Sequence, residues 1–178
     1  VAARPGAFQL CYDWGGWSYL VYKVAFLDVR CAFFRAAATE EVYVELPEEL
    51  RRPGEDEVAL LRMSMYGTRS AARNWQLQLG KDLRGVGFRQ AASSPCAYRH
   101  EELDARLVIH GDDLISTAEP EGLDFLAGVL RKRFSVKHSH RLGPGCDREA
   151  HFLDRTVRYA EGRGYSYHPN AKHIDEVV

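Results

Sequence analysis

The sequence has little cysteine, no long apolar run and almost no net charge. Four cysteines occur in 178 residues, with no Cys-x-x-Cys pair among them, so their spacing favours neither a disulfide framework nor a four-thiolate zinc site. No stretch approaches 18 consecutive apolar residues, and the first residues lack the order of a signal peptide. We therefore expect a soluble, intracellular protein without a membrane partner. The 24 basic and 25 acidic residues exclude a surface that is strongly basic all over, as many nucleic-acid-binding proteins have.

Charge is nevertheless concentrated locally. Residues 40–57 carry eight acidic side chains and two arginines, whereas residues 58–100 carry seven basic side chains and one aspartate. Residues 131–141 add five basic side chains and no acid. Such runs are usually solvated faces, so any grip on nucleic acid would have to be local.

The hydrophobic pattern predicts an α+β fold in a single domain over residues 1–178, with residues 1–20 unassigned. With 46% hydrophobic residues, the chain is long enough to bury a sizeable core. Apolar runs predict strands at residues 19–29, 42–46, 58–63, 103–109, 114–116 and 152–159. Apolar residues at helical spacing predict helices at residues 71–86, with Gly87 as C-cap, and at residues 120–134.

Three carboxylates carry the chemical signal. Asp112 and Asp113 occupy a predicted hairpin turn between two apolar strands, and Asp28 ends the apolar strand at residues 19–29. If those strands are neighbours, the three carboxylates converge, and their mutual repulsion favours a divalent cation. Oxygen ligands select Mg²⁺ or Mn²⁺, and two such ions can carry out phosphoryl transfer. The alternative is an ordinary Asp-Gly turn and an unrelated Asp28.

The order of the surrounding blocks resembles the reverse transcriptases of copia-type retrotransposons. The block FLDVRCAFF at residues 26–34 is similar to the family's first catalytic block, and EVYVELP follows at residues 41–47. SMYGTRSAARNW at residues 64–75 resembles the family's Ser-Leu-Tyr-Gly-Leu-Lys-Gln-Ala-Pro-Arg-Gln-Trp. Further blocks follow in the family's order, at residues 87–88, 94–98, 112–113, 134–137 and 152–153, so the resemblance extends over residues 24–178.

The resemblance implies an RNA-directed DNA polymerase whose palm is an antiparallel sheet backed by two helices, with partial fingers. It implies Mg²⁺ or Mn²⁺ as cofactor, an RNA or DNA template with its primer, and deoxyribonucleoside triphosphates as partners. The implied catalytic and metal-binding residues are Asp28, Asp112 and Asp113. The implied nucleotide-binding residues are Phe33, Tyr66, Gly67, Arg69 and Lys137. The implied primer-contacting residues are His110, Gly111, Phe152 and Leu153.

The sequence departs from the family pattern at several positions. His110 and Gly111 replace an aromatic and a branched apolar residue, Ser70 and Ala72 replace glutamine and proline, and Asp154-Arg155 stands where Gly-Ile is common. The chain begins close to Asp28, so the resemblance implies a fragment of a polyprotein that lacks most of the fingers and is followed by no RNase H, integrase or protease region. We therefore expect weak or no polymerisation by this chain alone. The resemblance also implies a location in a cytoplasmic particle or the nucleus.

Two other interpretations remain open. One is a non-catalytic remnant that keeps the palm fold and binds nucleic acid weakly. The other is a metal-binding module built from His138, His140, Cys146 and His151, whose spacing matches no recognised zinc site.

Overall fold

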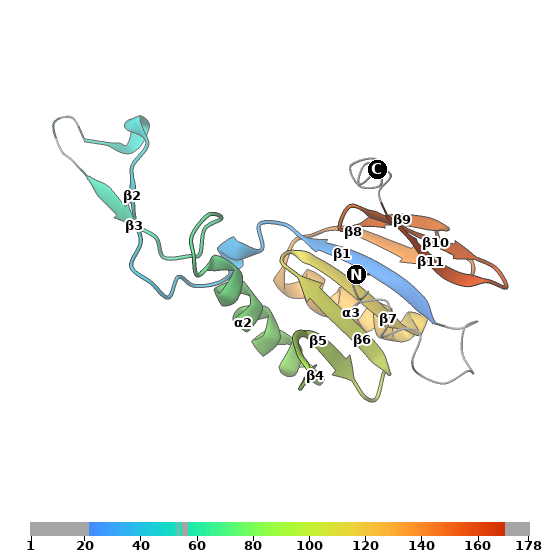
Figure 1. Ribbon diagram of the computed structural model, residues 1–178. Coiled ribbons are helices and arrows are strands. Elements are labelled where there is room, and N and C mark those ends of the chain that lie inside the picture. The colour runs from blue at the N-terminus through green and yellow to red at the C-terminus, as the bar shows by residue number, and fades with distance from the viewer. Residues whose placement is uncertain (1–21, 53, 55–56, 170–178) are drawn as a thin grey trace.

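The computed structural model describes residues 22–52, 54 and 57–169. Within these residues, antiparallel strands form three sheets, and two α-helices accompany them (Figure 1). The largest sheet has six strands in the order β4-β5-β6-β7-β1-β8. Its members are β1 (Lys23–Val29), β4 (Phe88–Ala91), β5 (Ser94–His100), β6 (Ala105–His110), β7 (Asp113–Ala118) and β8 (Val136–Leu142).

Strand β1 lies inside this sheet, between β7 and β8. Its central residues Val24–Leu27 are buried, because β1 is covered on both faces. The prediction of a doubly buried strand is thus confirmed for Lys23–Val29, and residues 19–21 of the predicted run lie outside the described residues.

Both α-helices pack on one face of the six-stranded sheet, as predicted. Helix α2 (Ala71–Arg84) and helix α3 (Pro120–Arg133) bury Trp75, Leu79 and Leu126 against the sheet's Leu27 and Leu107. The predicted end of α2 was wrong by two residues, because Gly85 rather than Gly87 is its C-cap. No helix within the described ranges is long and apolar enough to cross a membrane.

A three-stranded sheet packs on part of the opposite face. It consists of β9 (Glu149–Phe152), β10 (Arg155–Ala160) and β11 (Gly164–His168). Its Phe152 and Val157 join Phe26 and Ile115 in a second apolar cluster. The predicted single strand at residues 152–159 was wrong, because a turn at Leu153 and Asp154, both with positive φ, divides it into β9 and β10.

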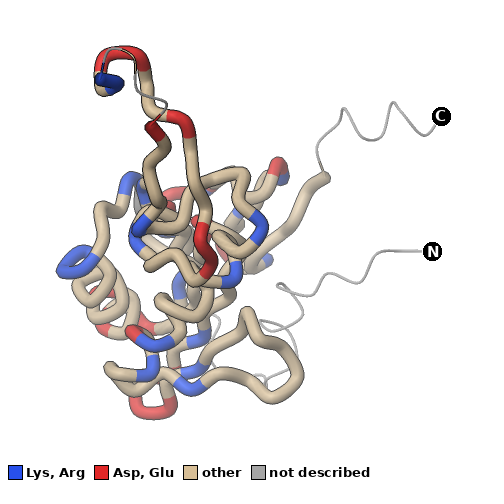
Figure 2. The backbone as a smooth tube through the Cα atoms, turned by 90° about the vertical axis from the view of Figure 1, so that its left-hand side faces the viewer, with Lys and Arg blue, Asp and Glu red and all other residues tan. Residues whose placement is uncertain are grey.

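A third, two-stranded sheet forms an arm that projects from the body (Figure 1). The arm contains β2 (Tyr43–Glu45), β3 (Val58–Leu60) and the short 3-10 helix η2 (Glu48–Leu50), and another 3-10 helix, η1 (Phe33–Arg35), precedes it. Strand β3 is shorter than the predicted 58–63. Acidic residues mark much of the arm in Figure 2, which is where the acidic run of the sequence lies.

Buried hydrogen bonds tie the base of the arm to α2. Asn74 donates to the Ser64 hydroxyl at 3.0 Å and accepts from the Thr39 hydroxyl at 3.0 Å. Ser64 in turn donates to the carbonyl of Ala37 at 3.2 Å. Both chain segments that lead to the arm are therefore held by one helix residue, Asn74.

Candidate active site

The backbones of the three predicted aspartates lie at one end of the six-stranded sheet. In the antiparallel pairing of β1 with β7, Asp28 lies directly opposite Asp113. Asp112 lies in the two-residue turn between β6 and β7. The predicted proximity of Asp28 to this hairpin is confirmed, although 84 residues separate Asp28 from Asp112 in the sequence.

Two features of the backbone shape this sheet end. Gly111 has φ of +62°, which glycine adopts readily at the first central position of a tight hairpin turn. The pairing of β1 with β8 shifts register between Leu27 and Val29, which lie opposite Ser139 and Val136, so β8 has an extra residue, a bulge, opposite Asp28. Bulges of this kind re-aim side chains and are common beside active sites.

Negative charge accumulates at Asp113. Burial raises the pKa of Asp113 above its ordinary value, and the charges of Asp112 and Asp28 raise it further. Lys137, on β8, lies 3.8 Å from the Asp28 carboxylate through its Nζ. A cation placed among these carboxylates would lower their repulsion, because opposite charges within a few ångströms favour the ionised form.

The donor chemistry of the three carboxylates suits Mg²⁺ or Mn²⁺, both of which prefer oxygen ligands. Across the described ranges, however, no group of three or more His, Cys, Asp or Glu side chains is gathered closely enough to hold a metal ion. The backbone thus brings the carboxylates to one sheet end, and their side chains would have to turn toward a shared cation. Of the alternative metal module, the His138 side chain lies outside what the structure describes, and His140, Cys146 and His151 form no such group within the described part of the chain.

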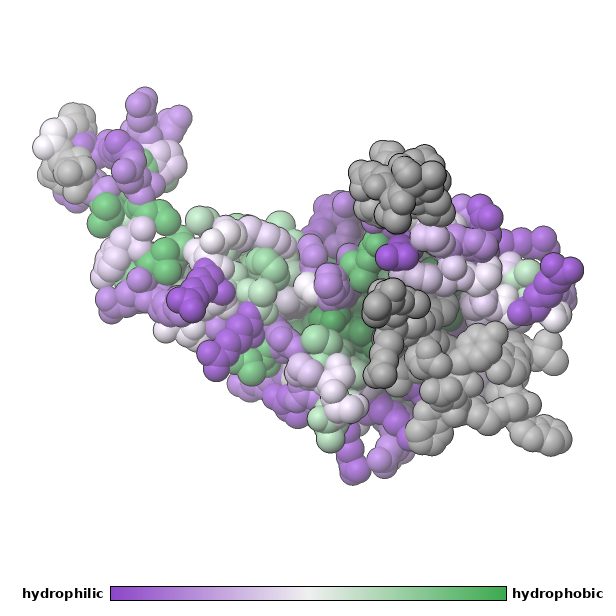
Figure 3. All heavy atoms as spheres, in the orientation of Figure 1, coloured by the Kyte–Doolittle hydropathy of each residue, from purple (hydrophilic) through white to green (hydrophobic). Residues whose placement is uncertain are grey.

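Aromatic side chains lie beside the carboxylates. The rings of Phe33 and Tyr66 lie 4.3 Å apart between centroids, and that of Phe34 lies 5.7 Å from Tyr66. Burial raises the pKa of Tyr66, and the negative charge of Asp112 contributes to the rise, which places the Tyr66 hydroxyl within electrostatic reach of the turn. Phe34 and Tyr66 are 44% and 42% exposed. Figure 3 shows hydrophobic residues where the arm joins the body. The exposure of Phe34 and Tyr66 leaves part of this aromatic group open to solvent.

The remaining predicted site residues lie at varying depth around this centre. Gly67 and Arg69 are exposed on the loop that leads into α2. His110 is exposed and pairs with Asp113 across the hairpin. Phe152 is buried, with its ring centroid 5.4 Å from that of Phe26, whereas Leu153 is 41% exposed in the turn after β9.

One contact to the carboxylate turn was not predicted from the sequence. The indole Nε1–H of Trp75 donates a hydrogen bond of 2.7 Å to the carbonyl oxygen of Gly111. The helical spacing correctly indicated that Trp75 is buried. A buried indole N–H usually has a hydrogen-bond partner, but periodicity contains no information on which partner it is.

Comparison with known proteins identifies relatives for most of the chain. The family model described as reverse transcriptase (RNA-dependent DNA polymerase) matches residues 19–143. The retrovirus-related Pol polyprotein from transposon TNT 1-94 of Nicotiana tabacum is 32% identical over 127 residues, which is 68% of this chain and 9% of that relative. The corresponding polyprotein from transposon RE2 of Arabidopsis thaliana is 34% identical over 122 residues, 65% of this chain and 8% of that relative.

The chain therefore spans less than a tenth of the length of these relatives. Among solved structures, apo telomerase from Candida tropicalis, truncated from the C-terminal domain, matches with a TM-score of 0.47 and 10% sequence identity. That match covers 78% of this chain and 34% of the telomerase chain.

Proposed function

The chain belongs to the copia-type reverse transcriptase family of retrotransposon Pol polyproteins, and we propose that it carries the catalytic palm of an RNA-directed DNA polymerase. The observation that carries this proposal is the register that sets Asp28 opposite Asp113, with Asp112 in the adjoining turn. The arm and η1 then correspond to part of the fingers, and the six-stranded sheet with its two helices corresponds to the palm.

In this proposal Asp28, Asp112 and Asp113 hold Mg²⁺ or Mn²⁺. The bound ions would activate the primer 3′-hydroxyl and stabilise the leaving oxygen of the triphosphate. The raised pKa of Asp113 supports this assignment, because the crowded negative charge is relieved when cations bind. Lys137 lies beside Asp28, and its ammonium group can offset the negative charge that develops on the leaving group.

The aromatic group beside the carboxylates would receive the incoming nucleotide. Phe33 is half-buried, and its ring packs against that of Tyr66, so the ring of Phe33 has little freedom to move. A fixed ring at the floor of a sugar pocket excludes a 2′-hydroxyl by repulsion, which selects deoxyribonucleotides. Gly67 and Arg69, on the adjoining loop, would contact the nucleotide or the template.

The turn between β9 and β10 would support the end of the primer. Phe152 packs on Phe26, which lies two residues before Asp28 on the same face of β1. Leu153 projects from the turn and is exposed. His110 and Gly111 border the carboxylates from the other side, so the primer end would lie between the two hairpins. The three-stranded sheet covers only part of this face, which leaves the carboxylate end for primer and template.

Primer extension tests the proposal. The purified chain is incubated at high concentration with a primed RNA template, deoxyribonucleoside triphosphates and Mn²⁺, beside Asp112→Asn and the matched control Asp124→Asn, whose carboxylate pairs with Arg141 on the surface. We expect slow nucleotide addition by the wild type and the control, and none by Asp112→Asn. Addition that survives in Asp112→Asn would refute the assignment of this carboxylate.

A non-catalytic remnant of a polymerase is the second candidate. Two observations favour it: the carboxylates of the described residues form no preassembled three-ligand group, and the Asp28 carboxylate is paired with Lys137. A wild-type chain that binds primed template but adds no nucleotide in Mg²⁺ or Mn²⁺ would favour this candidate over the polymerase.

A further inference from the structure

The hydrogen bond from Trp75 to Gly111 links helix α2 to the carboxylate turn across 36 residues of sequence. Trp75 is 1% exposed, and its ring packs edge-on against Phe134 with the centroids 5.1 Å apart. The indole therefore has a fixed position, and its N–H is aimed at one carbonyl oxygen of the turn.

The hydrogen bond to the Gly111 carbonyl bears on Asp112, because this carbonyl belongs to a peptide plane that contains the Asp112 nitrogen. The Gly111 carbonyl is part of the peptide plane that joins Gly111 to Asp112, and the Asp112 carbonyl is part of the next plane. The backbone N–H of Val29 donates to the Asp112 carbonyl at 3.1 Å. Both peptide planes that flank Asp112 are thus held by donors from outside the hairpin, one from α2 and one from the end of β1.

The turn has little else to hold it on its outer side. A Cβ built on Gly111 would meet no atom within 4 Å, and the strand pairing ends at His110 and Asp113. If nothing restrained the central peptide of this two-residue turn, the Gly111–Asp112 plane could rotate. Its rotation would change the direction in which the Asp112 side chain leaves the backbone.

We propose that Trp75 is a positioning residue, whose indole N–H fixes the Gly111–Asp112 peptide plane and so keeps the backbone of Asp112 beside Asp28 and Asp113, from where its carboxylate can turn toward a shared cation. The inference rests on the proposed function. Catalytic groups must be held within about 0.5 Å of their productive geometry. The loss of a residue that orients a metal ligand typically lowers metal affinity or activity by about 10- to 100-fold.

The variant Trp75→Phe tests this role, since it keeps an aromatic ring against Phe134 and removes only the part of the indole that carries the Nε1–H donor. Leu79→Ala is the matched control, because Leu79 lies one turn later on the same buried face of α2 and its truncation destabilises the fold without touching the turn. Circular dichroism identifies a temperature at which both variants are folded, and all measurements are made there.

In Trp75→Phe we expect the Mn²⁺ affinity, followed by electron paramagnetic resonance, to fall at least about 10-fold, and kcat for single-nucleotide addition to fall with it while the KM for primed template stays unchanged. In Leu79→Ala we expect both quantities to match the wild type. The same fall in both variants, or no fall in Trp75→Phe, would overturn the inference.

A measurement without metal separates this inference from the proposed function. The amide of Asp112 belongs to the peptide plane that Trp75 holds, so its ¹H–¹⁵N resonance should shift in Trp75→Phe and remain in place in Leu79→Ala. Unchanged Asp112 resonances in Trp75→Phe would overturn the inference even if the chain polymerises. A wild-type chain that neither binds Mn²⁺ nor adds nucleotides would instead refute the proposed function, whatever the Asp112 resonance does.

Discussion

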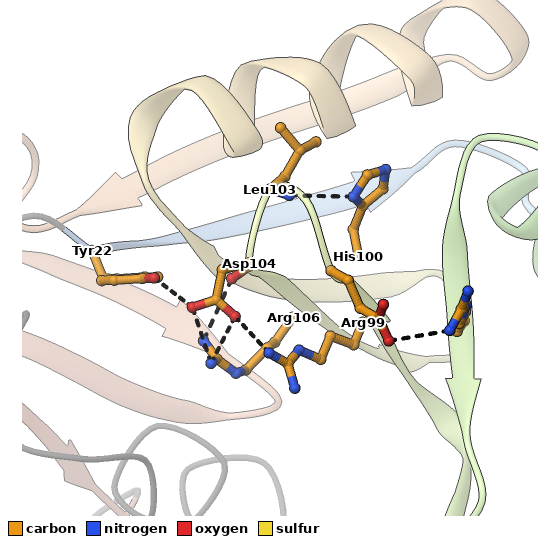
Figure 4. Close-up of polar contacts among 8 residues, drawn as sticks. Tyr22, Arg99, His100, Leu103, Asp104 and Arg106 are labelled. Carbon is orange, nitrogen blue, oxygen red and sulfur yellow. Dashed lines mark hydrogen bonds and ion pairs between the residues drawn. The ribbon is translucent and has the colours of Figure 1, made fainter.

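Asp104, in the turn before β6, accepts hydrogen bonds from three residues (Figure 4). The Tyr22 hydroxyl donates to it at 2.5 Å, Arg106 at 2.9 Å and Arg99 at 3.2 Å. Partial burial alone would raise the pKa of Asp104, but the Tyr22 hydrogen bond and the two guanidinium groups outweigh it and lower the pKa below the ordinary 3.8. The ionised carboxylate therefore stabilises the folded chain.

We expect Asp104→Asn to lower the melting temperature at pH 7 and to have little effect in acid. A carboxyl whose folded pKa is depressed stabilises the fold above its unfolded pKa and loses that contribution as the pH falls through the folded pKa. Because the Asp104 side chain is 37% exposed, the loss should be no more than about 1 kcal/mol at pH 7. Thermal unfolding of both proteins from pH 7 to pH 3 measures it, and a gap that stays constant across this range would contradict the account.

Phe33 carries a second prediction at this scale. If its ring forms the floor of the sugar pocket, Phe33→Val should raise the incorporation of ribonucleotides relative to deoxyribonucleotides, because the smaller side chain removes the clash with the 2′-hydroxyl. Single-nucleotide addition with matched ribo- and deoxyribonucleotides measures the ratio. Phe34→Val, a change in the neighbouring exposed ring, is the control, and an unchanged ratio in Phe33→Val would leave Phe33 as a packing residue.

The hairpin of β9 and β10 has turn residues that fit its backbone poorly. Leu153 and Asp154 have φ of +48° and +57°, which is the left-handed conformation of both central residues in a type I′ turn. Asparagine and glycine suit these positions, whereas this conformation costs a residue such as leucine roughly 1–2 kcal/mol. Glycine, which the resemblance implies at the position of Asp154, adopts this conformation without that cost.

We expect the double variant Leu153→Asn, Asp154→Gly to be more stable than the wild type by about 1 kcal/mol, which corresponds to a rise of about 2–4 °C in melting temperature. The same change removes the exposed Leu153 side chain, so we also expect weaker binding of primed template. Differential scanning calorimetry and a binding titration measure the two effects. A melting temperature that falls would show that the turn is not strained in solution.

The elements also show how far the sequence alone could be interpreted. Helices α2 and α3 and strands β1, β6 and β7 were predictable, because their apolar periodicity agrees with the face that each one buries. Strands β4, β5 and β8 were not predicted as strands, since they are more polar and their pairing depends on partners distant in sequence. The turn at Leu153 was also missed, because leucine is not a turn-forming residue.

At the scale of the whole molecule, the six-stranded sheet brings together residues that the sequence separates. The carboxylates could be predicted as a group, since the strand before each of them is apolar and the family blocks occur in order. The ion pair of Lys137 with Asp28 and the hydrogen bond of Trp75 to Gly111 could not, because both depend on the register of β8 and on the position of α2. These are properties of the packed chain rather than of any segment.

The distribution of charge is also a property of the whole molecule. The arm is acidic (Figure 2), so it should repel the phosphates of nucleic acid. The formal net charge is only −1, which provides no general attraction for a template. In the proposed function, binding of primed template would therefore depend on local cations, such as Lys137 beside Asp28 and the exposed Arg69 on the loop that leads into α2.

The most direct test of the carboxylate centre is the Mn²⁺ affinity of Asp28→Asn, measured by electron paramagnetic resonance beside Asp113→Asn and the surface control Asp147→Asn. Asp28 is the member of the centre that only the folded sheet brings to the hairpin. If the three carboxylates bind one cation centre, Asp28→Asn and Asp113→Asn should both weaken Mn²⁺ binding at least about 10-fold, and Asp147→Asn should bind as the wild type does. Wild-type affinity in Asp28→Asn would contradict the shared centre and the polymerase built on it.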